Sequence, residues 1–471
     1  MATLLGVYRS LFPSDPADDP FEQAPLMPTD LFAFVGHLLE RSGGYHHIAP
    51  DVSGDADISF RRIVVDERMR QDAVQIGTKW RTTPLEPGRR LPKVPDEVEA
   101  LWKSLGGFAN ATVFVHLDDE AEAPIWWTIC LELLMTCDES CQDIGFDPEN
   151  PFFKLVMDEY VGQALTMRNV FNRVQHGPFS LSAAAEDLLC VQAKSRTPSV
   201  GCTLRSLTHH LALLPPRGQV RARWVAPVFA ENKDQSTERL GLLLVPFPYR
   251  VADNAFHDAG VDQSGHWGWF GLEQRWLPLN KDRRKREALV EYVEALVAAA
   301  RAKGGRVDGV VLPELALDFP QFRSLATALA RDENIDFLIS GISTNRTGRK
   351  GNFVGIMPFF LLGSERDPEI TGWQGMILVR EKHHRWKLDQ SQIEAYGLTG
   401  LSADKSWWEE LTILSRSLDL LVYRGNTTLT TLICEDLARV DPCQAVVRAV
   451  GPNLLIALLA NSEAIRPLIP K

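Results

Sequence analysis

The residues of this chain best suited to chemistry are Glu314, Lys382 and Cys434, because each ends an apolar stretch typical of a buried strand. In α/β sheets, functional groups gather at the carboxyl ends of strands. A carboxylate can accept a thiol proton as general base, and a lysine can stabilise a developing oxyanion. The three residue types together therefore indicate covalent catalysis by a cysteine thiolate on a carbonyl or nitrile carbon.

Cys434 is predicted to lie near a turn from a strand to a helix. Thr428–Ile433 favours a strand, and the helix-like segment Leu437–Val450 follows, with Pro442 predicting that the regular helix begins only there. Backbone N–H groups at such a turn can lower a thiol pKa and hold an oxyanion. A lone cysteine would more simply be a buried, inert one; Glu314 and Lys382 favour the catalytic interpretation.

Three motifs of the C-terminal half, in this order, resemble those of the carbon–nitrogen hydrolase (nitrilase) superfamily. They are Val310–Leu315 for its glutamate motif, Arg380–His384 for its lysine motif and Leu432–Leu437 for its nucleophile motif. The resemblance covers roughly residues 238–460. It implies an αββα sandwich, usually dimerised, that acts on non-peptide C–N bonds without metal or cofactor. We therefore expect a small-molecule amide or nitrile substrate and a homo-oligomer.

The same resemblance assigns roles to individual residues. It implies that Glu314 is the general base, Lys382 the oxyanion stabiliser and Cys434 the nucleophile, with Lys387 as the alternative lysine. Many members carry a further glutamate beyond the lysine that positions substrate. Glu394 is the best candidate for that role, and Glu435 is a second candidate for substrate binding.

Composition indicates an ordinary water-soluble chain of two or three domains. The formal net charge of −11 over 471 residues does not favour a nucleic-acid or anionic-membrane surface. The N-terminus does not read as a signal peptide, and seven cysteines favour reduced thiols and a cytoplasmic location. The spacing of Cys130, Cys137 and Cys141 favours structural cysteines over zinc ligands, and Asp118-Asp119 favours an acidic loop over a Mg²⁺ site.

A linker-like segment at 230–237 divides the chain into an N-terminal domain, 1–235, of unassigned function, and a nitrilase-like domain, 236–471. The first is predicted to be a mixed, mainly helical α+β domain, partly irregular up to about residue 90. Two of its predicted elements are a strand at 111–117 and a helix at 203–213. In the second, strands and helices alternate from Leu240 to Arg331 and consecutive strands follow, which predicts a layered α/β fold. The segment 400–427 is predicted to form a lid, a partner surface or a packed helix.

Two functions of different classes follow. The first is a thiol-dependent hydrolase of a non-peptide amide or nitrile bond, through an acyl- or thioimidate-enzyme on Cys434, with an acyltransferase as its close relative. The second is an assembly or sensing module with little hydrolysis, because nitrilase-like domains also occur in multi-domain bacterial proteins, including defence proteins linked to reverse transcriptases. The chain ends sooner after Cys434 than is usual for the family. This predicts either a shortened fold or completion by another subunit.

Overall fold

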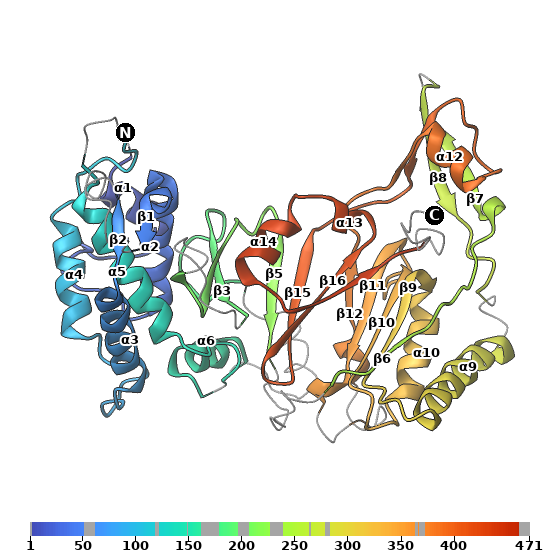
Figure 1. Cartoon of the computed structure of the whole chain (residues 1–471), viewed down its shortest axis with the longest axis horizontal. Coiled ribbons are helices and arrows are strands. Elements are labelled where there is room, and N and C mark those ends of the chain that lie inside the picture. Colours follow the sequence, from blue (N-terminus) through green and yellow to red (C-terminus); the bar gives the residue numbers. More distant parts are fainter. Residues whose placement is uncertain are drawn as a thin grey trace.

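The computed structural model describes residues 2–50, 62–117, 122–147, 149–161, 179–195, 207–226, 239–262, 265–277, 283–362, 366 and 373–460. A helical unit built from the N-terminal part of the chain lies at one end of the molecule, and two larger sheets lie toward the other end (Figure 1). The protein is thus of the mixed α/β class. Within the described ranges, no helix combines the length and the apolar character that crossing a membrane requires.

The N-terminal unit is built around α5, which is apolar on most of its surface and packs against α2, α3 and α4. Its helices are α1 (Leu4–Leu11), α2 (Pro28–Ser42), α3 (Glu67–Thr82), α4 (Asp96–Gly106), α5 (Ile125–Ser140) and α6 (Pro151–Val161). Its strands are β1 (Ile48–Pro50), β2 (Ile63–Val65), β3 (Cys190–Ala193) and β4 (Leu211–Leu214). The unit is mainly helical, as predicted.

The first 90 residues are partly irregular, as predicted, between α1 and α2 and after α3, while α1, α2 and α3 each pack a buried apolar face into the core. Two other predictions for this unit were wrong. Residues 111–117 form no strand beyond an isolated bridge between Thr112 and Thr3. The segment predicted as a helix at 203–213 contains the first residues of β4, paired with β3. Its first residues, 203–206, lie outside the described residues.

The C-terminal part contains two sheets that share one apolar core. The first has the strand order β12-β11-β10-β9-β6 and the second the order β17-β16-β15-β5. Their strands are β5 (Arg221–Val225), β6 (Leu242–Leu244), β9 (Gly309–Leu317), β10 (Phe337–Thr344), β11 (Lys350–Pro358), β12 (Leu378–Glu381), β15 (Ser417–Tyr423), β16 (Thr427–Ile433) and β17 (Leu454–Leu458). Side chains of both sheets meet between them, for example Leu338 and Ile356 of the first with Leu421 and Ile433 of the second.

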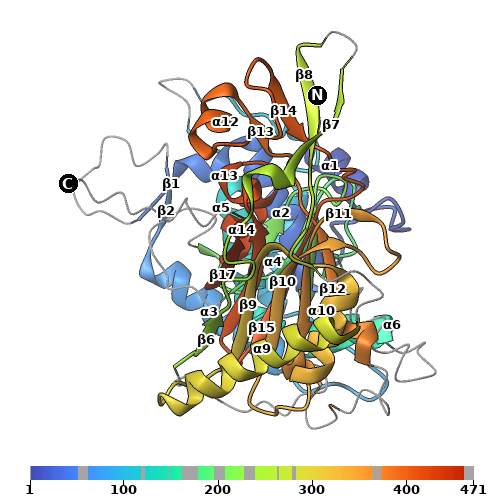
Figure 2. The same ribbon diagram turned by 90° about the vertical axis from the view of Figure 1, so that its right-hand side faces the viewer.

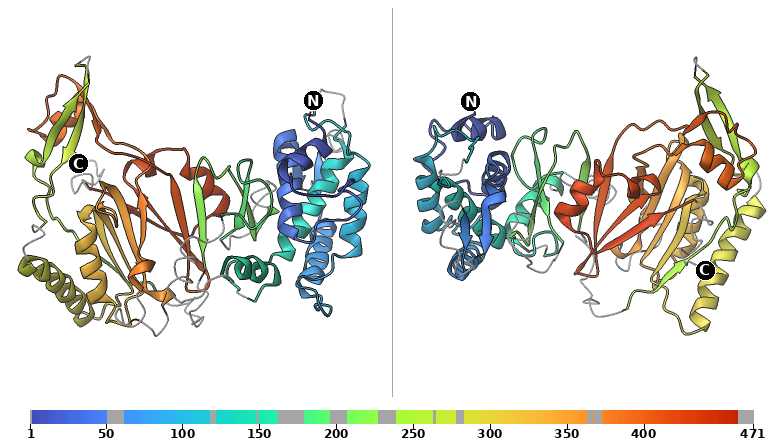
Figure 3. Two further views of the ribbon diagram at one scale, coloured as in Figure 1. Left: turned by 180° about the vertical axis from the view of Figure 1, so that it is seen from behind. Right: turned by 45° about the horizontal axis from the view of Figure 1, so that its top comes forward.

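Helices cover the outer faces of this pair of sheets. On the first sheet lie α9 (Arg283–Ala302) and α10 (Phe319–Leu329), and α10 contacts β10 and β11. On the second lies α14 (Cys443–Val450), which also contacts β4 of the N-terminal unit. Figure 3 shows from two further sides that the N-terminal unit lies beyond the second sheet. The predicted strands and helices of this part are present, with bounds that differ by several residues, but β7 and β8 stand between β6 and α9, where no strand was predicted.

A smaller sheet forms an arm that stands at the upper right of Figure 1 and at the top of Figure 2, while α13 (Glu435–Ala438) lies nearer the centre of Figure 1. Its strand order is β13-β14-β8-β7, and α12 packs against it around Phe270, Leu388 and Trp407. The elements of the arm are β7 (Phe256–Val261), β8 (Trp267–Leu272), β13 (Lys387–Leu388), α12 (Gln390–Tyr396) and β14 (Ser406–Glu409). The segment 400–427 therefore supplies β14 and the buried strand β15, so that the packed helix predicted there was wrong, while a lid or partner surface stays a prediction.

Strand β5 connects the two parts of the chain. It pairs in parallel with β15 from Ser417 to Leu421, inside the second C-terminal sheet. The core of the N-terminal unit continues into Leu418, Leu420 and Val422 of β15. The boundary predicted at residue 235 thus separates β5 from the sheet to which it is hydrogen-bonded.

Candidate active site

Glu314 is placed by a bulge in β9. Between Ser340 and Ile342 the neighbouring strand β10 advances two residues, while β9 advances from Leu312 to Leu317. The extra residues of β9 leave the ladder, and Glu314, 4 % exposed, is among them. Leu315 has a φ of 54°, which a β-carbon disfavours and which marks strain at this turn. The bulge therefore takes the Glu314 side chain out of the regular alternation of side chains between the two faces of the strand.

Cys434 lies at the turn that the sequence predicts. It follows β16 directly, and α13 begins at the next residue. Its φ is 43°, a conformation that costs on the order of 1–3 kcal/mol for a residue with a side chain. Its N–H donates to the carbonyl of Leu458 in β17 at 2.8 Å, so that β17 fixes the main chain of this turn. The thiol is partly exposed and lies close enough to Glu314 and Lys382 for both charges to act on its pKa.

Lys382 follows β12 and is almost fully buried, with 1 % exposed. Its N–H donates to the Asn352 carbonyl at 2.8 Å. Its ammonium donates to Glu314 Oε1 at 2.9 Å and to Glu409 Oε2 at 2.7 Å. The structure thus brings together the three residues selected from the sequence. Lys387, the alternative lysine, lies on β13 in the arm, with its ammonium 5.5 Å from the centre of the Trp408 ring.

Two further residues complete the cluster, and sequence reasoning missed both. Glu409, the last residue of β14, bonds to Lys382, and Asn352 on β11 donates its amide N–H groups to Glu314 Oε1 and Glu409 Oε1, both at 2.8 Å. Both are buried. The sequence carries no clear signal for either residue, because Glu409 follows only the short pair Trp407-Trp408 and Asn352 lies inside a strand.

The two glutamates predicted to bind substrate lie elsewhere. Glu394 is exposed on α12 and accepts a hydrogen bond from Gln390 at 2.9 Å, so its place beside Lys382 is taken by Glu409. The connection after Lys382 includes α12, and it returns to the site only with β14. Glu435 follows the nucleophile, but its carboxylate pairs with Arg439, the residue directly after α13. Neither side chain makes a hydrogen bond or ion pair with Glu314, Lys382 or Cys434 among those described.

The cluster of Glu314, Glu409 and Lys382 holds two carboxylates for one ammonium. Burial raises the pKa of the Cys434 thiol to about 12, and the charge of Glu314 acts in the same direction, while Lys382 opposes it. Burial would lower the pKa of Lys382, but the charges of Glu314 and Glu409 outweigh burial and raise this pKa above its ordinary value. The resting state is therefore a neutral thiol beside a charged lysine, and a base must remove the thiol proton as the thiol reacts.

A second buried network links the loops that carry Lys382 and Cys434. Asp436 accepts hydrogen bonds from the N–H groups of His383 and His384 at 2.9 and 3.0 Å. Arg380, 2 % exposed, donates to the Thr431 carbonyl of β16 at 2.8 Å. Burial, together with the charge of Arg380, lowers the pKa of His383 to about 3, which leaves its ring neutral. The network holds the nucleophile turn and the lysine loop in register.

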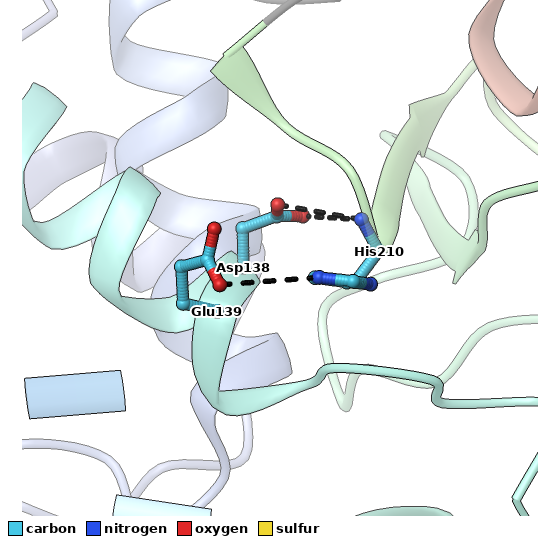
Figure 4. Close-up of side chains that lie close together, drawn as sticks. All are labelled: Asp138, Glu139 and His210. Atoms are coloured by element: carbon cyan, nitrogen blue, oxygen red, sulfur yellow. Dashed lines mark hydrogen bonds and ion pairs between the residues drawn. The ribbon is translucent and has the colours of Figure 1, made fainter. Parts of the chain in front are cut away.

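A separate group, Asp138, Glu139 and His210, has its oxygen and nitrogen atoms close enough for a metal ion (Figure 4). Asp138 is fully buried and accepts the N–H groups of His209, His210 and Leu211, and it thereby fixes the chain as it enters β4. Burial raises its pKa to about 7, against these hydrogen bonds. Because three amides already use its oxygens, the arrangement is that of a structural cap.

The other residues of the N-terminal part that could do chemistry are either buried in its core or lie outside the described residues. Cys130, Cys137 and Cys141 are buried free thiols in and directly after α5, as the structural interpretation expects. Lys194 is also buried, and it donates to the Thr208 carbonyl. Asp118-Asp119 lies outside the described residues.

No protein-family model matches this chain, and no curated protein is similar to it in sequence. The interpretation of the site therefore depends on its geometry and on the motifs.

Proposed function

We propose that this protein is a thiol-dependent hydrolase that cleaves a non-peptide C–N bond, of an amide or a nitrile, through a covalent intermediate on Cys434. The observation that carries the proposal is one buried cluster in which Lys382 bridges Glu314 and Glu409, with Cys434 close enough for all three charges to act on the pKa of its thiol. Two stacked sheets with helices on both outer faces support a nitrilase-like fold as part of the same proposal.

The first half of the reaction forms the covalent bond. Glu314 accepts the thiol proton as Sγ of Cys434 attacks the carbonyl carbon of an amide, and the carbonyl electrons move onto the oxygen. The Lys382 ammonium stabilises this oxyanion. The protonated Glu314 then delivers the proton to the leaving nitrogen, the C–N bond breaks, and an acyl-enzyme and an amine result. With a nitrile, the same proton goes to the nitrile nitrogen and a thioimidate forms.

The second half regenerates the thiol. Glu314, again a carboxylate, removes a proton from an attacking water and returns it to Sγ as the thioester bond breaks, which releases a carboxylic acid. A thioimidate takes up one water first, loses ammonia and continues as the acyl-enzyme. If an amine or alcohol replaces the water, the same site performs acyl transfer.

The charge balance of the cluster supports this order of events. A free thiolate would add a third negative charge beside Glu314 and Glu409 against one ammonium, and these two carboxylates raise the pKa of Cys434 further than burial alone does. Transfer of the proton to Glu314 leaves the total charge of the cluster unchanged. The nucleophile therefore forms only as a base accepts its proton.

The test uses p-nitroanilides of small carboxylic acids and measures the acyl adduct by intact mass and peptide mapping. We expect wild-type protein to be acylated at Cys434 and Cys434→Ala to form no adduct. Glu314→Gln leaves the thiol equally accessible but removes the base, so acylation should fall at least about 100-fold, within the usual range for general acid–base catalysis. Glu435→Gln, next to the nucleophile but paired with Arg439, is the matched control and should keep the wild-type rate.

Two results would contradict the proposal. Acylation of Glu314→Gln at the wild-type rate would mean that exposure alone explains the reactivity of Cys434. Failure of every probe to acylate the wild type would favour an assembly or sensing module instead.

A further inference from the structure

The bulge that carries Glu314 leaves main-chain groups that β10 does not pair. Strand β10 pairs with β9 at Leu312 and again at Leu317, and β6 pairs with Gly309–Val311, before the bulge. The carbonyls of Leu315 and Ala316 lie between these points. Buried carbonyls are nearly always hydrogen-bonded, so the bulge needs donors from another part of the chain.

Two side chains of the segment Glu273–Leu277, which follows β8, supply these donors. The Gln274 amide donates to the Leu315 carbonyl and, at 3.2 Å, to that of Leu317. The Trp276 indole N–H donates to the Ala316 carbonyl at 2.9 Å. Three consecutive carbonyls directly after Glu314 are thus held by this one segment.

The part of the chain between β6 and α9, which includes Glu273–Leu277, also lies beside Glu409, the second carboxylate of the site. In the arm, Phe270 of β8 lies opposite Glu409 of β14, and the Phe270 carbonyl accepts the N–H of Glu410 at 2.9 Å. The segment Glu273–Leu277 begins directly after β8, and the N–H of Glu273 donates to the carbonyl of Ala255, the residue directly before β7. The part of the chain between β6 and α9 therefore contacts the main chain beside both Glu314 and Glu409.

We propose that Gln274 and Trp276 are positioning residues, which hold the bulge of β9 so that the Glu314 carboxylate stays beside Cys434. This inference rests on the proposed function for its catalytic consequence, though not for the contacts themselves. Without the two donors, the strained turn at Leu315 loses the bonds that oppose its relaxation. Glu314 then moves away from the thiol, while the hydrogen bonds between the strands elsewhere in the sheet remain.

The test compares Gln274→Met and Trp276→Phe with the wild type. Each change removes the N–H donor and keeps most of the side-chain volume. Gln390→Met is the matched control, because Gln390 bonds only to Glu394 on the exposed side of α12 among the contacts described. Hydrogen exchange of peptides covering 312–317 is the first readout. We expect exchange at least about tenfold faster in both variants, because these amides depend on local opening of the bulge.

The pH dependence of Cys434 acylation by p-nitroanilides is the second readout. At pH 7 we expect acylation about tenfold to 100-fold slower than in the wild type, part of the contribution of a general base. The difference in acylation rate between each variant and the wild type should become smaller as the pH rises toward 10, because hydroxide then removes the thiol proton without Glu314. A variant that merely unfolds in part would show the same deficit at every pH.

Each outcome decides the question. Unchanged hydrogen exchange in both variants overturns the inference, whatever the activity. Faster exchange with wild-type acylation shows that the two residues hold the bulge but do not position the base, and also overturns it. If the wild type itself is not acylated, the proposed function fails, and hydrogen exchange alone then decides whether the contacts hold the Glu314 turn.

Discussion

Cys434 owes its chemistry to the residues around it more than to its own turn. The position after β16 could lower a thiol pKa through backbone N–H groups, yet burial and the carboxylates have the larger effect and raise it to about 12. A residue at a strand-to-helix turn is thus not activated by that turn alone. The lysine and the two glutamates decide when the thiol gives up its proton.

This balance predicts the effect of removing one carboxylate. Glu409 raises the pKa of Cys434, so Glu409→Gln should lower that pKa and increase the thiolate fraction at pH 8. Alkylation of Cys434 by iodoacetamide should become several-fold to about tenfold faster, a change of up to one pH unit in the rate profile. Lys382→Met should have the opposite effect, because the ammonium lowers the same pKa. Peptide mass spectrometry from pH 6 to 10 gives both profiles.

Glu410→Gln is the control for this experiment, since Glu410 is the next residue along the chain and its side chain is exposed. It should keep the wild-type profile. Slower alkylation of Glu409→Gln than of the wild type would show that Glu409 does not oppose the thiolate. Acylation by amides should nevertheless fall in Glu409→Gln, because Lys382 loses one of the two carboxylates that fix its position.

At the residue scale, sequence reasoning selected residues that follow an apolar run, although Glu314 lies in a bulge within β9 and only Lys382 and Cys434 follow the end of a strand. Glu314, Lys382 and Cys434 follow runs of apolar residues, and such runs can be read without a structure. Glu409 and Asn352 could not be identified in this way. Glu409 belongs to the arm, and Asn352 lies inside β11, where its side chain is simply one inward-facing position. Asn352 reaches Lys382 within the first sheet, and only the packing of the arm against that sheet brings Glu409 there.

At the scale of elements, the parallel strands β9 and β10 lie so close together at the bulge that almost no free space remains between them. A β-carbon on Gly341 of β10 would come within 2.3 Å of the Leu315 nitrogen and 2.4 Å of Glu314 Cα. Because those atoms are main chain, one strand would have to move. A glycine at this position is therefore required for the bulge to lie as close to β10 as it does.

Gly341→Ala should accordingly destabilise the protein by about 1–3 kcal/mol, the usual range for overpacking, and should slow acylation of Cys434 by displacing Glu314. Urea unfolding and the p-nitroanilide assay measure the two effects. Gly218→Ala is the matched control, because a β-carbon there meets nothing within 4 Å. Equal stability of Gly341→Ala and the wild type would mean that the two strands separate without cost.

Elements were predictable where one pattern of side chains dominates. The buried strands β9, β10 and β16 are continuous apolar runs and were identified, as was α9 from its helical spacing. The strands β14 and β15 were not, because the long connection 400–427 mixes tryptophans, charges and short apolar runs. Their role follows from pairing with β8 and β5, which are distant in sequence.

At the scale of the whole molecule, the N-terminal unit and the outer face of the second sheet share one hydrophobic core, which is separate from the core between the two sheets. Leu418, Leu420 and Leu432 of the second sheet pack in the same cluster as Trp224 and α5. The N–H of Ser195 donates to the Val450 carbonyl at the end of α14, at 2.9 Å. Composition marked a boundary at 235 because residues 230–237 are polar, but a polar connection does not require independent domains.

We therefore predict that residues 236–471 do not fold alone. Expressed separately, this fragment lacks β5 and exposes the face of β15 that the N-terminal unit covers, so it should aggregate or unfold without a cooperative transition. Co-expressed with 1–235, it should purify as a one-to-one complex that is acylated at Cys434. A fragment that begins at Gln219 keeps β5 and so separates loss of the strand from loss of the core. A monomeric 236–471 fragment with a sharp thermal transition and an acylated Cys434 would show instead that the shared core is dispensable.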